Sequence, residues 1–149
     1  MSTRAKILAA AAALAVLVVA LSRGGEPSAQ LQQLQDDPMA SYVPPGATLV
    51  DSDSRGEGTS LGKRVQAQVT RLFQLPPGQG RRALADAQEQ AAAGGWAPVA
   101  ASTQRALVAR KQLPDGRAEL TVVRVEDARL LPKDVQPPAL SVSLRHLGA

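Results

Sequence analysis

The stretch ALVARKQLPDGRAELTVVRVED, from Ala106 to Asp127, decides the fold that the sequence predicts. Two runs rich in β-branched and aliphatic residues flank the turn-forming residues Pro114, Asp115 and Gly116. Two such runs around a short turn with glycine are typical of a β-hairpin. The segment therefore predicts a pair of antiparallel strands, and the rest of the domain is expected to be built around this pair.

Further strands are expected on both sides of the hairpin. In LGKRVQAQVTRLF (61–73), apolar and polar residues alternate, which indicates a half-buried strand with Val65, Ala67 and Val69 facing one side. ALSVSLRHL (139–147) alternates in the same way and ends the chain. We expect this last strand to lie at an exposed edge of the sheet.

One helix is expected between the strand at 61–73 and the hairpin. RRALADAQEQAAAGG (81–95) contains strong helix formers, with Leu84, Ala87 and Ala91 along one stripe and two glycines as a C-cap. The predicted order is therefore β-α-β-β-β, in which one helix covers one face of a four-stranded, mainly antiparallel sheet. The fold class is α+β, and we assign the domain to residues 47–149.

The first 23 residues predict a membrane segment. Arg4 and Lys6 precede an uncharged apolar run of 15 residues (7–21), and Arg23 follows it. As a helix this run would be about 22 Å long, so flanking residues must help it to span the ~30 Å hydrocarbon core. We expect an uncleaved signal anchor over 1–23, with a cytoplasmic N-terminus and an extracytoplasmic domain. A cleaved secretory signal is the alternative, because the basic head and the run length fit one.

Residues 24–46 are expected to be a linker or stalk, because Gly, Pro, Gln, Ser and Asp dominate them. Within this segment, AQLQQLQDD (29–37) can form one or two helical turns that Pro38 would stop. Its composition favours a solvated spacer over a packed helix.

The composition excludes several classes of function. The chain has no cysteine, which excludes disulfides, thiolate metal sites and a cysteine nucleophile. One histidine and three aromatic residues cannot build a multi-histidine metal cluster or a stacking platform for nucleic acid. Three of the 17 basic residues flank the apolar run, which leaves 14 against 13 acidic residues elsewhere. We therefore expect no nucleic-acid partner, no metal and no other cofactor.

The polar stretch DSDSRGEG (51–58) resembles the start of a calcium loop. Asp51, Asp53 and the sixth-position glycine fit the loop pattern, but Arg55 stands at the fifth position and a glycine at the twelfth. A polar turn is expected instead, in which the arginine neutralises its acidic neighbours. A small envelope hydrolase that uses Asp51, Asp53 and Glu57 is an alternative.

The segment GQGRRA (78–83) matches a dinucleotide fingerprint, but no acidic residue follows at the distance that a ribose partner requires. Arg81 and Arg82 at a helix N-terminus predict a weak anion site instead. No serine elbow accompanies His146, so we expect a surface histidine on an outward-facing or fraying strand end, with no catalytic residue. Trp96 is expected to pack over the end of the sheet.

The chain is rich in alanine and uses arginine more than lysine. Together with the anchor and the linker, the segment DPMASYVPPGATLVDSDSRGEGTSLGK (37–63) resembles those of small, signal-anchored, single-pass proteins of actinobacteria. The resemblance implies an extracytoplasmic domain and supplies no catalytic residue. We expect a non-catalytic, membrane-anchored module, not an enzyme, which binds another envelope protein, for example by strand addition at an exposed edge.

Overall fold

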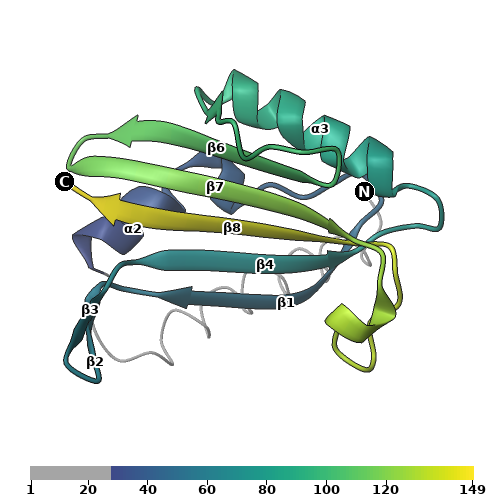
Figure 1. The fold of residues 1–149 in the computed structure, drawn as a ribbon, viewed down its shortest axis with the longest axis horizontal. Coiled ribbons are helices and arrows are strands. Elements are labelled where there is room, and N and C mark those ends of the chain that lie inside the picture. Colours follow the sequence, from purple (N-terminus) through teal and green to yellow (C-terminus); the bar gives the residue numbers. More distant parts are fainter. Residues whose placement is uncertain (1–27) are drawn as a thin grey trace, which may run out of the picture.

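The computed structural model describes residues 28–149 (Figure 1). The predicted anchor over residues 1–23 lies outside this part of the chain. Within residues 28–149, no helix is long and apolar enough to cross a membrane.

A six-stranded antiparallel sheet forms the centre of the domain, with the spatial order β1-β4-β8-β7-β6-β5 (Figure 1). In chain order its strands are β1 (Thr48–Arg55), β4 (Gln68–Gln74), β5 (Ala97–Pro98), β6 (Ala106–Leu113), β7 (Gly116–Val125) and β8 (Ala139–Gly148). Two short strands, β2 (Gly58–Ser60) and β3 (Lys63–Val65), pair with each other in a separate hairpin. The predicted hairpin is confirmed, since β6 and β7 pair from Leu113 with Gly116 onward.

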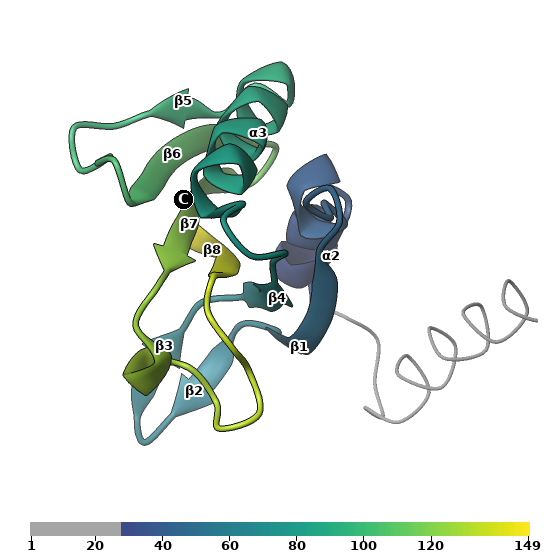
Figure 2. The same ribbon diagram turned by 90° about the vertical axis from the view of Figure 1, so that its right-hand side faces the viewer.

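Two helices lie on one face of this sheet, α2 (Ala29–Gln35) and α3 (Gly80–Ala93) (Figure 2). The predicted stripe of α3 is confirmed, because Leu84, Ala87 and Ala91 are buried against the sheet. The α+β class is therefore correct, but residues 28–149 contain two α-helices and a six-stranded sheet, where the sequence predicted one helix and four strands.

The segment before β1 belongs to the hydrophobic core from residue 28 on, although its composition favoured a solvated spacer. Leu31 and Leu34 of α2 and Met39 of the short helix η1 (Pro38–Ala40) are all buried in the main core cluster. Leucines three residues apart share one face of a helix. This spacing lets even a two-turn helix cover part of the sheet.

A buried carboxylate fastens this segment to the rest of the domain. Asp37 Oδ1 accepts hydrogen bonds from the backbone N–H of Met39 at 2.9 Å and from Trp96 Nε1 at 3.1 Å. Its Oδ2 pairs with Lys111 Nζ at 2.7 Å. The predicted burial of Trp96 is confirmed, and its indole N–H has a partner as buried tryptophan requires.

Two predictions about strands are wrong. The polar stretch at 51–58 does not form a turn, because residues up to Arg55 belong to β1 and pair with β4. The strand predicted over 61–73 is divided into β3 and β4, so Val65 pairs in the small hairpin and only the second half enters the main sheet. Backbone pairing with β4 forms β1 even though its own side chains are nearly all exposed.

The C-terminal strand is not an edge. β8 lies between β4 and β7, while β1 and the two-residue β5 form the edges. For the same reason His146 is not a surface residue, since its side chain is fully buried. Its Nδ1 accepts a hydrogen bond from the backbone N–H of Gly148 at 2.9 Å. The ring of a neutral histidine must then carry its proton on Nε2.

Candidate functional site

Within residues 28–149, no helix covers the face of the sheet opposite α2 and α3 (Figure 2). Successive side chains of a strand point to opposite faces, so the residues that alternate with the core residues lie on this open face. On the three central strands β4, β8 and β7, the open face consists of Gln68, Thr70, Leu72, Ser141, Ser143, Arg145, Glu119, Thr121 and Val123. We call this surface the open face.

A row of polar side chains crosses the open face and connects three strands. Gln68 Nε2 donates to Thr70 Oγ1 at 3.2 Å and to Ser143 Oγ at 3.1 Å. The two hydroxyl oxygens are 3.3 Å apart. Gln68 Oε1 accepts a hydrogen bond from Arg55 Nη2 of β1 at 2.7 Å. These hydrogen bonds hold the side chains of Gln68, Thr70 and Ser143 in one arrangement. The surface is therefore already ordered before a partner binds to it.

Beside this row, one carboxylate holds two guanidinium groups. Glu119 accepts from Arg110 Nη2 at 3.2 Å and from Arg145 Nη2 at 3.0 Å. The side chains of Arg110 and Arg145 are 52% and 55% exposed, whereas that of Glu119 is 16% exposed. Exposed ion pairs of this kind contribute little to stability. Their effect here is to orient two cationic groups toward the solvent above a shielded carboxylate.

The polar groups border a shallow hollow of about 230 Å³, which is lined by Gln68, Glu119, Thr121, Ser143 and Arg145. The hydrogen bonds recorded for the Ser143 hydroxyl join it to an amide and to another hydroxyl, and neither group is a base that could activate it. Within residues 28–149, no three histidine or acidic side chains gather closely enough to hold a metal ion. The chemistry that this surface offers is hydrogen bonding and charge pairing.

The other end of the open face carries apolar side chains among charged ones. Val123 and Val125 of β7 line a wider hollow of about 670 Å³ together with the short helix η2 (Ala128–Leu130). Arg105, Asp127 and Arg129 lie around the same hollow. Leu130 of η2 is 76% exposed. The open face thus combines a row of polar and charged groups at one end with apolar groups surrounded by charged ones at the other, a combination typical of surfaces that contact proteins.

The structure does not bring the three predicted acidic residues together. Asp51 pairs with Leu72 and Asp53 with Thr70, which places both on the open-face side of the edge strand β1. Glu57 follows the strand and bonds elsewhere: the Ser28 hydroxyl, and also backbone groups of Glu57 and Gln30, lower the pKa of its carboxyl. The predicted calcium-like stretch is therefore an extended strand whose third carboxylate bonds at the start of α2.

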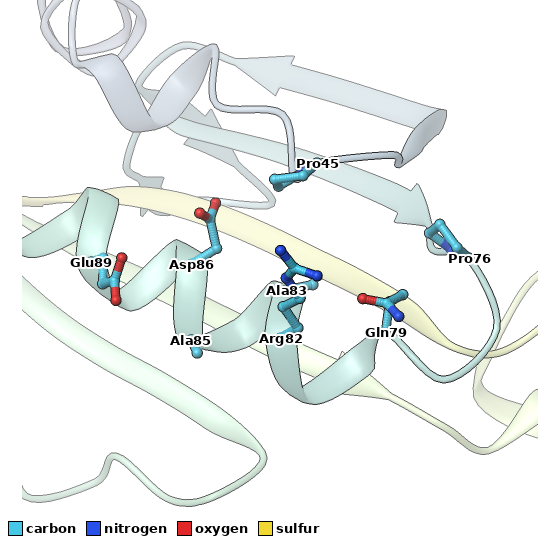
Figure 3. Close-up of a pocket in the computed structure, with 8 residues that line it drawn as sticks. All are labelled: Pro45, Pro76, Gln79, Arg82, Ala83, Ala85, Asp86 and Glu89. Carbon is cyan, nitrogen blue, oxygen red and sulfur yellow. The ribbon is translucent and has the colours of Figure 1, made fainter.

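Arg81 and Arg82 lie in the first turn of α3 as predicted, but they line different hollows. Arg81 borders one of about 430 Å³ that also contains Glu126, and Arg82 borders one of about 570 Å³ (Figure 3). A Cβ placed on Gly80 would lie 2.9 Å from Glu126 Oε1, so this carboxylate already faces the start of the helix. The geometry supplies no convergent pair of arginines for one anion.

The hollow beside Arg82 is formed by α3 and by two proline-containing loops, and Figure 3 shows Pro45 and Pro76 opposite the helix. Asp86, which lines it, accepts a hydrogen bond of 2.6 Å from the Tyr42 hydroxyl. Burial and this carboxylate together raise the pKa of Tyr42 above its usual value. The contact connects the segment before β1 with α3 and has a structural role.

The sequence indicated the outward residues of each strand but not the site that they form. The alternations in SVSLR and RAELTV place Ser143, Arg145, Glu119 and Thr121 on outward faces. Their assembly depends on the register of β7, β8 and β4, which brings residues 75 positions apart within hydrogen-bonding distance. A single sequence carries no local signal for that register.

Comparison with known proteins gives no match: no protein-family model, no curated protein and no solved structure matches the chain.

Proposed function

We propose that the chain is a membrane-anchored, extracytoplasmic binding module that performs no catalysis and that contacts an envelope protein through the open face of its sheet. The observation that carries this proposal is the face opposite α2 and α3, which no helix of residues 28–149 covers and on which hydrogen bonds and ion pairs hold the polar side chains in place. An ordered surface loses little conformational entropy on binding.

The character of the open face favours a protein as its partner. One end presents Arg110 and Arg145 around a shielded Glu119, and the other end presents valines and the exposed Leu130 among charged side chains. Hydroxyl groups of Thr70, Thr121 and Ser143 lie between the two ends in the register of the strands. A partner surface with acidic groups at one end and apolar groups at the other is complementary to this arrangement.

The membrane part of the proposal rests on the sequence of residues 1–23, with its basic head and its apolar run. The test is the intact mass of the native protein, measured separately from washed membranes and from the culture medium. The proposal predicts the full-length mass in the membranes. A mass lacking about the first 22 residues, found in the medium, would show a cleaved signal and a secreted protein instead.

A further inference from the structure

The hairpin of β2 and β3 separates from the main sheet and projects from one end of the domain (Figures 1 and 2). Its two strands pair from Gly58 with Val65 to Ser60 with Lys63. Leu61 and Gly62 form the turn, with φ of 50° and 75°. A leucine in the left-handed region is uncommon, because its Cβ is crowded there. This leucine is moreover fully exposed, at 100%.

Two cationic residues follow the exposed leucine after Gly62. Lys63 and Arg64 are exposed and form no ion pair within residues 28–149. The hairpin from 58 to 65 contains no acidic residue, and the nearest one along the chain is Glu57 at its base. An apolar tip next to two cations is the pattern by which a peripheral segment enters the headgroup region of an anionic bilayer.

The base of the hairpin touches the point where the described chain begins. A Cβ placed on Gly56 would lie 2.9 Å from Ser28 Oγ, and the Glu57 carboxylate accepts a hydrogen bond from the same hydroxyl. Only four residues separate Ser28 from Arg23 at the end of the apolar run. A fully extended chain covers at most ~3.6 Å per residue, so Ser28 lies within about 18 Å of Arg23.

We propose that the β2–β3 hairpin is a membrane-contacting finger, in which Leu61 enters the interface of an anionic bilayer while Lys63 and Arg64 pair with lipid phosphates. The inference rests on the proposed anchoring, because the anchor brings the base of the hairpin close to the bilayer. The strands of the hairpin are three residues long and extend ~10 Å from that base. This length covers a large part of the distance between the base and the end of the apolar run, which is at most about 18 Å. The contact would hold the domain in one orientation relative to the membrane.

The test uses the full chain in nanodiscs of phosphatidylcholine and phosphatidylglycerol. Since the chain has no cysteine, Leu61→Cys gives one site for a nitroxide spin label. Leu130→Cys is the matched control, because it is an exposed leucine of η2, and the yellow-green segment that contains η2 lies at the opposite end of Figure 1 from β2 and β3. The relative collision rates of the label with oxygen and with a water-soluble nickel chelate report immersion in lipid.

The proposal predicts that the label at 61 is immersed and the label at 130 is in water. Lys63→Gln combined with Arg64→Gln should lower the equilibrium constant for contact about 30-fold, since each cation near an anionic surface contributes about fivefold. If the label at 61 is as exposed to water as the label at 130 while the chain stays in the nanodisc, the hairpin does not contact the membrane and this inference is wrong. The proposed anchoring would still stand. A chain that does not enter nanodiscs would overturn both.

Discussion

Single side chains fasten the first described segment to the rest of the domain. Asp37 contacts Trp96 and Lys111, and Tyr42 contacts Asp86 of α3. Each contact joins a residue before β1 to a residue that follows much later in the chain. These pairs make the early segment part of the folded unit and not a spacer in front of it.

Tyr42 makes a prediction about pH. Because its pKa is raised in the folded protein, the unfolded chain loses this proton from about pH 10 while the folded chain keeps it. The stability that this tyrosine contributes is therefore fully present below about pH 10 and falls as the pH rises further. Tyr42→Phe should cost about 1–2 kcal/mol at pH 7, and the cost should shrink at pH 11.

Urea unfolding, followed by fluorescence of the single tryptophan in mild detergent, measures this difference between pH 7 and pH 11. Measuring both proteins side by side cancels the titration of groups that they share. A difference between wild type and Tyr42→Phe that stays constant to pH 11 would contradict the role assigned to the Tyr42–Asp86 bond.

Between the two helices, α2 is the one whose packing the sequence did not predict. Leu34 is 1% exposed in the core, whereas Gln35 of the same helix is exposed. Leu34→Ala should lower the free energy of unfolding by about 3 kcal/mol, because it leaves a cavity beneath the helix. Gln35→Ala should change it by less than about 0.5 kcal/mol. Equal urea midpoints for the two variants would mean that the segment is a spacer.

Elements whose signals are local could be predicted from the sequence, and those that depend on partners could not. The β6–β7 hairpin and α3 carry their own turn, cap and apolar stripe, and both are present where expected. β1 has no apolar alternation, because it is an edge strand with nearly every side chain in solvent. Only its pairing with β4 makes it a strand, and no property of DSDSR predicts that pairing.

Strand order explains the remaining errors. The alternation of β8 correctly predicts which of its side chains face the core, but alternation is the same in a central strand and in an edge strand. Placing β8 between β4 and β7 buries His146 and removes the C-terminal edge as a surface for strand addition. The same placement brings Ser143 next to Gln68 and Arg145 next to Glu119, which creates the open face.

At the scale of the whole molecule, the two faces of the sheet have different roles. One face supports α2 and α3 over an aliphatic core, and the other presents an ordered polar surface to its surroundings. The base of the β2–β3 hairpin touches Ser28, the first described residue, which follows the proposed anchor by only a few residues. An oriented domain would present the open face to a neighbouring protein at a fixed height above the bilayer.

The most direct measurement compares the reactivity of single cysteines in native membranes and in the purified full chain. Thr121→Cys lies on the open face, and Gln88→Cys lies on the exposed side of α3 as the matched control. If a partner covers nine-tenths of the molecules, a membrane-impermeant thiosulfonate should react about tenfold more slowly with Thr121→Cys in native membranes. The control should react at one rate in both preparations. Equal rates for Thr121→Cys in both would contradict the assignment of the open face as the binding surface.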